Sequence, residues 1–192
     1  MTIIALVQLA IDEEDKKNIF SPLASHLASI FNASVNISTD PPRLLDRSHP
    51  SFDKQRNQLN SDKLLRWLAT TITNNTKSCD PTKRITLGIC NFDAYSSSLN
   101  FVFGQASLNG GVAVMYLPRL KQEFYGLGAD RSIFIERVLK EATHEVGHAF
   151  GLEHCPKRSC VMHFSNSLVD TDRKAKDFCE ICAETIVSKV RH

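Results

Sequence analysis

The chain has 192 residues and a formal charge of +2, with 42% apolar and 23% charged residues, as in an ordinary globular protein. The balanced charge argues against the basic surface that a nucleic-acid partner needs, and no apolar run approaches the roughly 18 residues that cross a bilayer. We therefore expect one domain over residues 1–192, a monomer, with neither a nucleic-acid nor a membrane partner.

The apolar run over residues 3–9 predicts a buried strand. Unlike a signal peptide, it lacks a basic start and passes at once into acidic residues from Asp12 to Asp15, so we expect a cytoplasmic protein. The next predicted elements are a helix over 12–31 that is interrupted near Ser21 and Pro22, a strand over 34–37, a polar loop over 39–62 and a helix over 63–73.

In the second half, turn residues separate three predicted strands over 85–90, 99–106 and 112–117. Apolar positions at helical spacing then predict a helix over 132–150, and Gly151 is placed to end it in the left-handed conformation. A last helix is predicted over 173–190, with the lysines from Lys174 to Lys176 on a solvated face. The coarse pattern is α/β followed by a helix-and-loop end.

The motif over residues 144–154 reads His-Glu-Val-Gly-His-Ala-Phe-Gly-Leu-Glu-His. On a helix, His144 and His148 lie about 6 Å apart along one face, so both imidazoles can reach one zinc ion. His154 can return after Gly151 as the third ligand, and Glu145 is placed to take a proton from zinc-bound water. Three protein ligands leave a fourth position open, which is typical of catalytic zinc.

Chance does not explain this motif on an ordinary amphipathic helix. From the composition of the chain, a random match is expected on the order of 10⁻⁵ times. The motif with a following methionine, here Met162, is the metzincin signature. Taken alone, Met162 would be interpreted as a core residue.

Four of the six cysteines fall in the last 38 residues. In a reducing compartment they are expected as thiols or metal ligands, and two short-spaced pairs can supply four thiolates to a structural zinc. A redox pair and two disulfides are the weaker alternatives. The predicted ligands are Cys155, Cys160, Cys179 and Cys182.

The metzincin helix followed by this cysteine cluster resembles the archaemetzincins, zinc peptidases of archaea and vertebrates. Further resemblance lies in Arg56, Gln58, Asn60, Asp93, Tyr95 and the segment from Leu99 to Gly104, whereas Leu59 stands where an aromatic is expected. The resemblance implies a metzincin-like zincin fold. In that fold, residues 1–151 form a twisted, mostly parallel five-stranded sheet with an active-site helix. Residues 152–192 form a small helical part that the cysteine zinc site holds together.

The resemblance also implies a substrate. A peptide or protein would lie along the one antiparallel edge strand, here about 100–106, with the predicted contacts at Asn100, Phe101, Val102, Phe103 and Gly104. We expect two zinc ions per chain and hydrolysis of peptide bonds, of endopeptidase or aminopeptidase type, with Glu145 as general base. The alternative is a zinc-containing protein that binds peptides but rarely cleaves them. Tyr95, Tyr116 and Tyr125 are candidates to donate a hydrogen bond to the transition state.

Overall fold

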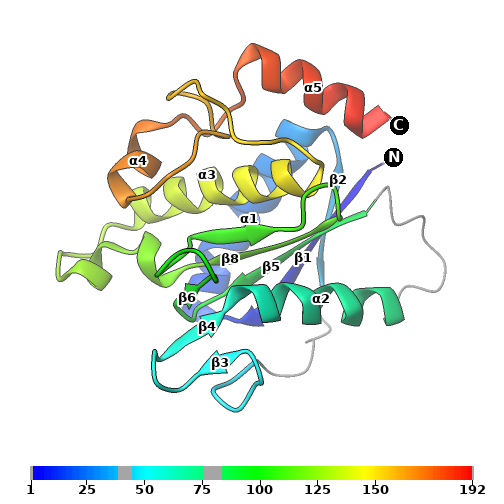
Figure 1. Cartoon of the computed structure of the whole chain (residues 1–192). Coiled ribbons are helices and arrows are strands. Elements are labelled where there is room, and N and C mark those ends of the chain that lie inside the picture. The colour runs from blue at the N-terminus through cyan, green and yellow to red at the C-terminus, as the bar shows by residue number, and fades with distance from the viewer. Residues whose placement is uncertain (1, 39–44, 76–83, 192) are drawn as a thin grey trace.

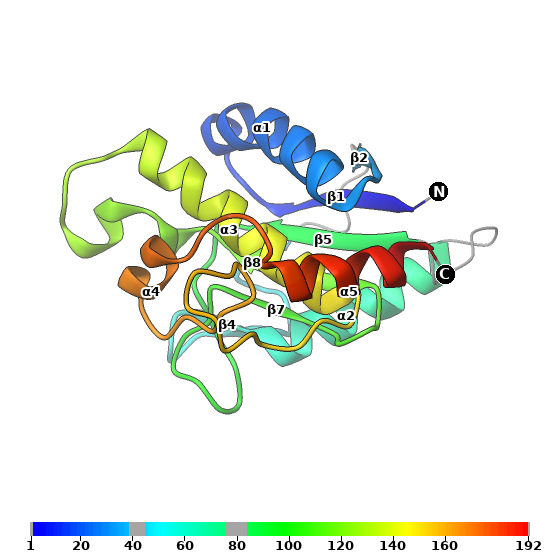
Figure 2. The same ribbon diagram turned by 90° about the horizontal axis from the view of Figure 1, so that it is seen from above.

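The computed structural model describes residues 2–38, 45–75 and 84–191. Its centre is a five-stranded sheet in the order β2-β1-β5-β8-β7. Helices cover both faces of this sheet (Figures 1 and 2). The strands are β1 (Ile3–Ala10), β2 (Ser34–Ser38), β5 (Arg84–Cys90), β7 (Gly104–Ala106) and β8 (Val112–Tyr116).

The sheet is parallel except at one edge. β1 pairs in parallel with β2 and with β5, and β5 pairs in parallel with β8. Only β7 runs antiparallel, on the outer side of β8. Because β5 and β8 are covered on both faces, their residues from Ile85 to Cys90 and from Val112 to Tyr116 are all buried and apolar apart from Thr86 and Gly88. The predicted fold class is confirmed.

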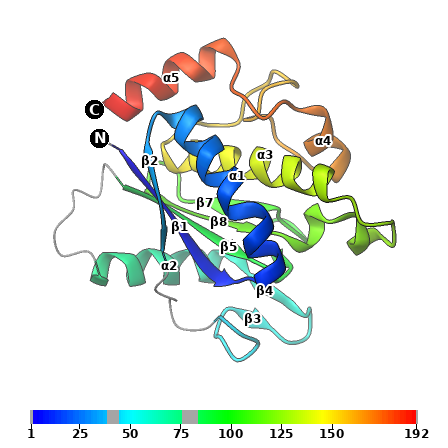
Figure 3. The ribbon, with the colours of Figure 1, turned by 180° about the vertical axis from the view of Figure 1, so that it is seen from behind.

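Two helices cover the face of the sheet that carries the larger core. α1 (Glu13–Phe31) and α3 (Arg131–Ala149) lie side by side there, whereas α2 (Ser61–Asn75) covers the opposite face (Figures 1 and 3). On the α1 side, Leu23 and Leu27 are fully buried in the larger core, and on the α2 side Leu64 and Leu68 pack in a second cluster. None of the described helices is both long and apolar enough to span a bilayer.

The predicted interruption of the first helix is wrong. α1 runs without a break through Pro22. Proline removes one hydrogen bond but its fixed φ is compatible with a helix. The buried face formed by Ile19, Leu23, Leu27 and Phe31 offsets that loss by packing against the sheet.

The predicted loop over residues 39–62 is wrong in part. Residues 39–44 lie outside the described residues, but the later part forms β3 (Phe52–Asp53) and β4 (Gln58–Asn60). These two strands build a small sheet with β6 (Ala94–Tyr95), in the order β3-β4-β6. The strands are too short for their periodicity to be visible in the sequence, because two or three residues complete no alternating pattern.

The end of the chain also departs from its prediction. In place of one helix over 173–190 there are two, α4 (Leu168–Arg173) and α5 (Glu180–Arg191), which lie beyond α3 on the side away from the sheet (Figure 1). Lys174 lies between them and is not on a solvated face: its side chain is fully buried against Glu141 of α3. Two short 3₁₀ turns, η2 (Pro118–Leu120) and η3 (Gln122–Tyr125), precede α3. The proposed division of one domain at residue 151 stays a prediction.

Candidate active site

The second half of α3 carries the motif, and the helix is fixed at both ends. At its start the Asp130 side chain accepts a hydrogen bond from the Ile133 N–H. Val138, Ala142 and Val146 recur every four residues and are fully buried against the sheet. Gly151 follows the last turn at φ 89°, the left-handed conformation predicted for it. Because this side of α3 is anchored in the core, the residues on its other side hold fixed positions.

Three histidine side chains converge beyond that anchored face. The ring centroids of His144 and His148 are 4.5 Å apart, and the His154 ring lies 5.4 Å from the first and 4.7 Å from the second. One ring nitrogen from each of the three lies within 4.8 Å of the other two. The predicted ligand set is therefore gathered at one point, although His154 comes from the loop after the helix.

Hydrogen bonds fix which nitrogen of each helical histidine is available. Nδ1 of His144 lies 2.8 Å from the carbonyl oxygen of Val161, and Nδ1 of His148 lies 2.6 Å from that of Leu152. A carbonyl oxygen can only accept, so both Nδ1 atoms donate and both Nε2 atoms carry a lone pair. These two Nε2 atoms are 3.0 Å apart.

That spacing fits a metal ion. Two lone pairs 3.0 Å apart repel each other unless a cation lies between them, and imidazole nitrogens on one tetrahedral zinc lie ~3.3 Å apart. Burial also lowers the pKa of His144, His148 and His154, so each ring is held in the neutral form that binds metal. The third ring, His154, is more exposed and packs edge-on against Phe164, at 5.0 Å between centroids.

Glu145 is buried beside the histidines with one carboxylate oxygen unpaired among the described residues. It is 4% exposed, and its Oε2 has no hydrogen-bond partner among the described residues. Burial, and then the nearby charge of Glu141, raise its pKa well above the usual range. A buried carboxylate with a raised pKa and a free oxygen is suited to accept a proton.

Two glycines leave room for this arrangement. A Cβ on Gly104 would lie 2.5 Å from Cγ of Glu145, so β7 can pass beside the carboxylate only because residue 104 has no side chain. A Cβ on Gly147 would lie 2.6 Å from Sδ of Met162, which is fully buried under the helix. Met162 thus lies directly beneath the turn that carries the histidines.

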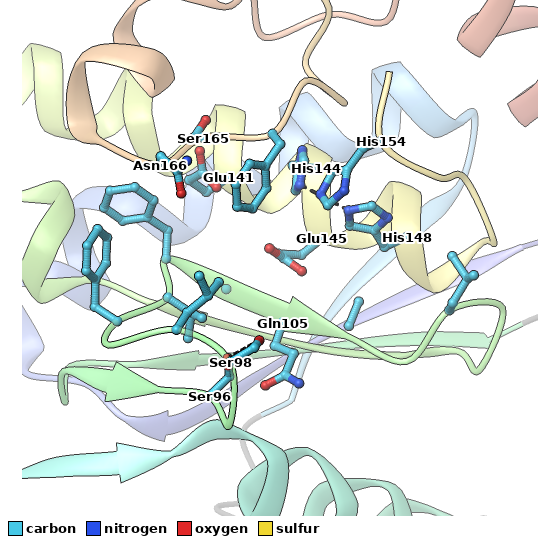
Figure 4. A pocket seen from close by; sticks show the side chains of 18 of the residues that line it. Ser96, Ser98, Gln105, Glu141, His144, Glu145, His148, His154, Ser165 and Asn166 are labelled. Carbon is cyan, nitrogen blue, oxygen red and sulfur yellow. Dashed lines mark hydrogen bonds between the residues drawn. The ribbon is translucent and has the colours of Figure 1, made fainter. Parts of the chain in front are cut away.

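A cavity of about 510 Å³ runs between α3 and the edge of the sheet (Figure 4). The three histidines lie at one end, Glu145 faces the strand, and Glu141, Ser165 and Asn166 gather beside the histidines along the helix (Figure 4). The lining residues are Ser96, Ser98, Leu99, Asn100, Phe101, Val102, Phe103, Gly104, Gln105, Ala106, Leu108, Glu141, His144, Glu145, His148, His154, Phe164, Ser165 and Asn166.

The predicted edge strand over residues 99–106 is shorter than expected. Only residues 104–106 form β7, and Asn100 to Phe103 line the cavity as irregular chain. The reason is competition for backbone groups. The carbonyl of Asn100 accepts hydrogen bonds from Arg56 and Gln58, and the N–H of Val102 donates to Ala94.

None of the three candidate tyrosines lines the cavity. Tyr116 is fully buried and donates to Ser61, Tyr95 donates to Asp53, and Tyr125 donates to the carbonyl of Arg119. Each hydroxyl is committed elsewhere, so this structure offers no tyrosine beside Glu145.

The four C-terminal cysteines form a second cluster. One Sγ from each lies within 4.8 Å of all the others, and the cluster joins the loop after α3 to the start of α5. Sγ of Cys155 and Cys179 are 3.8 Å apart, far beyond the ~2.05 Å of a disulfide bond but close to the ~3.8 Å between two thiolates on one tetrahedral zinc. All four are free thiols.

The surroundings of the cysteines favour thiolate at one of them. The N–H of Cys182 donates to Cys179 and lowers the pKa of that thiol to about 7. Burial raises the pKa of Cys160 and of Cys182. The Cys155 N–H also donates to the carbonyl of Met162, so the loop that holds the cysteines is the same loop that passes under the histidines.

Sequence reasoning missed the polar group beside the histidines, formed by Glu141, Ser165 and Asn166. Glu141 is one helical turn before Glu145, and that spacing of four residues was the available signal. Its partner Lys174 is 33 residues away and no local pattern connects the two. Ser165 and Asn166, which follow Met162 in the chain, line the cavity beside Glu141 (Figure 4).

The sequence and fold of this chain are similar to those of known proteins over the region that carries both clusters. The family model of Peptidase family M54 matches residues 31–188, which contain both clusters. The chain belongs to this family. The predicted resemblance to archaemetzincins is confirmed.

Three relatives illustrate the similarity. The archaemetzincin of Archaeoglobus fulgidus is 41% identical over 88% of this chain and 89% of its own length. That of Pyrococcus furiosus is 51% identical, but the match covers 54% of this chain and 54% of that protein, so it spans about half the length of that relative. The crystal structure of the Methanopyrus kandleri archaemetzincin superposes with a TM-score of 0.81 at 33% identity, covering 100% of this chain and 96% of that one.

Proposed function

We propose that this chain hydrolyses peptide bonds of peptides or proteins, with one zinc ion on His144, His148 and His154 and with Glu145 as general base. The observation that carries the proposal is the pair of free Nε2 atoms 3.0 Å apart, with a partnerless buried carboxylate oxygen one residue along the helix. Three neutral ligands leave a fourth position for substrate or water, as a catalytic site requires.

A zinc ion bound there would supply Lewis-acid polarisation of the scissile carbonyl and would lower the pKa of the attacking water. The chain's own residues do the rest. Glu145 accepts the proton of that water as the oxygen attacks the carbonyl carbon, and it then delivers a proton to the leaving amine. The histidines donate through Nδ1 to backbone carbonyls and keep their rings in one orientation throughout.

The peptide backbone is proposed to pair with the outer edge of β7. This strand is paired with β8 on one side only, so its other side offers backbone groups to an extended peptide. The three residues Gly104, Gln105 and Ala106 all line the cavity. Residues Asn100 to Phe103 would instead contribute side chains to the wall, because part of their backbone is already hydrogen-bonded.

A second zinc ion is proposed on Cys155, Cys160, Cys179 and Cys182. Four thiolates fill a tetrahedral shell, so no position would remain for substrate. The spacing of 3.8 Å between Cys155 and Cys179 supports this assignment. Its role is structural, because it connects the loop under the histidines to α5.

A peptide-library screen with zinc-loaded protein tests the activity. Mass spectrometry should find cleavage of some members, and Glu145→Gln should abolish it. A library with acetylated amino termini separates the two modes of cleavage: internal cuts that survive acetylation mark an endopeptidase, and cuts that require a free amine mark an aminopeptidase. Binding without any cleavage by the wild-type chain would contradict the proposal and would favour a peptide-binding protein.

A further inference from the structure

The polar part of the cavity lining is rich in hydrogen-bond acceptors and contains no cationic side chain. Of its nineteen lining residues none is lysine or arginine, whereas two, Glu141 and Glu145, are carboxylates. Three oxygens at or near its surface, one of them on Glu145, are buried without a partner among the described residues: Glu145 Oε2, Gln105 Oε1 and Ser165 Oγ. Burial without a hydrogen bond is costly, so these oxygens are suited to a ligand that brings donors.

The two oxygens of the Glu141 carboxylate differ in their contacts. Its Oε1 accepts from the Thr171 hydroxyl at 3.0 Å and lies 2.9 Å from Nζ of Lys174. No interaction in the described part of the chain uses its Oε2. Because Glu141 lines the cavity while Lys174 does not, a ligand meets the carboxylate first and the ammonium lies behind it.

The ion pair between Glu141 and Lys174 is almost completely buried, which is uncommon for charged side chains. Glu141 is 3% exposed and the Lys174 side chain is not exposed at all. Replacing a buried ion pair by apolar residues of similar volume is often neutral or stabilising, so the presence of the pair is weak evidence for a role in stability. Glu141 lies one turn of α3 from Glu145 and beside Ser165 and Asn166 (Figure 4), in the wall of the cavity where the peptide is proposed to bind.

We propose that Glu141, with Ser165 and Asn166, forms a subsite that selects a cationic group of the substrate, the side chain of lysine or arginine. The inference rests on the proposed peptidase function and deepens it by naming a substrate class. The carboxylate oxygen of Glu141 accepts from the cation, and the free oxygen of Ser165 and the amide of Asn166 accept further donors. A free α-ammonium group is the other source of the same chemistry.

Matched peptides test the subsite without relying on turnover. Zinc-loaded Glu145→Gln protein is titrated calorimetrically with acetylated, amidated octapeptides in which one lysine moves through the sequence. Each has a twin with norleucine, which keeps the four-carbon stem and loses the ammonium. A hydrogen bond to a charged group corresponds to roughly tenfold or more in affinity, so at one position lysine should bind about tenfold more tightly than norleucine. Equal affinity at every position would overturn the proposal.

A variant pair assigns the preference to Glu141. Glu141→Gln alone leaves Lys174 buried and uncompensated, so the decisive variant is Glu141→Gln with Lys174→Met, which removes both charges at similar volume. The ratio between lysine and norleucine peptides should fall to about 1 in this variant. Glu136→Gln is the control, because Glu136 lies on the same helix, pairs with Lys140 and does not line the cavity. An unchanged ratio in the double variant would overturn the assignment.

Two further experiments distinguish the side-chain cation from the α-ammonium group, and the subsite proposal from the peptidase proposal. Peptides with a free amino terminus and no lysine measure the contribution of the α-ammonium group, and a preference for them alone would assign the subsite to that group. Cleavage of the same peptides by the wild-type chain tests the peptidase proposal on its own. Cleavage without any preference for a cation would refute the subsite and leave the peptidase function standing. A cation preference in binding without cleavage would support the subsite and refute the peptidase function.

Discussion

The two ligand clusters of this chain are built from different kinds of structure. The histidine cluster stands on α3, whose other side is buried in the core, and it opens into the cavity. The cysteine cluster joins a loop to the start of α5 and shares no residue with the lining of that cavity. A site on a rigid element with an open position suits chemistry, whereas a closed site between loops suits the folding of those loops.

The difference has an energetic consequence. Apolar burial of Val138, Ala142 and Val146 holds α3 in place without help from a metal. The segment from Cys155 to Cys179 contains only the six-residue α4 and few of the largest buried side chains. Metal binding at the cysteines would be coupled to folding, so zinc there would stabilise its segment strongly, whereas zinc at the histidines would stabilise α3 only weakly.

The largest expected effect is on stability at the cysteine cluster. Cys179→Ser removes one thiolate, and structural zinc contributes on the order of 10 kcal/mol of folding free energy to its segment. We expect a markedly lower Tm in thermal melts and faster hydrogen exchange over residues 155–191. Lys157→Ala, an exposed change in the same loop, should leave both unchanged. An unaltered melt of Cys179→Ser would count against a structural metal.

At the histidine cluster, removing the proposed base should lower catalysis without releasing zinc. Glu145→Gln removes the acceptor but no metal ligand, so kcat/KM should fall by roughly 10² or more while bound zinc stays constant. Peptide cleavage and elemental analysis of the same sample measure both quantities. Glu153→Gln, an exposed change within the motif, should retain wild-type activity. Wild-type turnover in Glu145→Gln would show that another group accepts the proton.

A smaller loss of catalytic rate is expected when a side chain at residue 104 displaces the Glu145 carboxylate. In Gly104→Ala the new methyl group would meet Cγ and Oε1 of Glu145 at 2.5 Å, and the carboxylate must shift. Displacement by about 1 Å costs on the order of 10²-fold in rate at most, and the fold should be preserved because the contact is with a side-chain end. Gly128→Ala is the control, since a Cβ there meets nothing within 4 Å. Equal activity of the two variants would contradict the placement of Glu145 against β7.

The smallest stability effect should come from a histidine ligand. His148→Ala abolishes zinc at the histidine cluster but leaves the packed face of α3 untouched. We expect a change on the order of 1 kcal/mol, which lowers the Tm of a chain of this size by about 2–4 °C. If this variant melted as early as Cys179→Ser, the asymmetry between the two clusters would not exist.

Local patterns predicted the parts of the molecule that local chemistry determines. Apolar positions at helical spacing predicted the helix, Gly151 predicted its end, and the motif predicted that His154 returns beside His144 and His148. The strands β5 and β8 were likewise predictable, because strands buried on both faces are continuous apolar runs in the sequence. These features depend on neighbours within one or two turns of the chain.

Features that depend on distant partners were not predictable in this way. Lys174 resembles a solvated lysine until Glu141 is placed beside it by the folding of α4 over α3. The strand expected at 99–106 is shortened because Arg56 and Gln58 reach across to the Asn100 carbonyl. In each case a contact between segments more than 30 residues apart overrides the local preference.

The central claim is that one chain holds two zinc ions in two different settings. Anomalous diffraction at the zinc edge from crystals of the zinc-loaded chain tests it most directly. The account predicts two peaks, one among the rings of His144, His148 and His154 and one among the four Sγ atoms. A single peak, or zinc absent from the cysteine cluster of fully loaded protein, would contradict it.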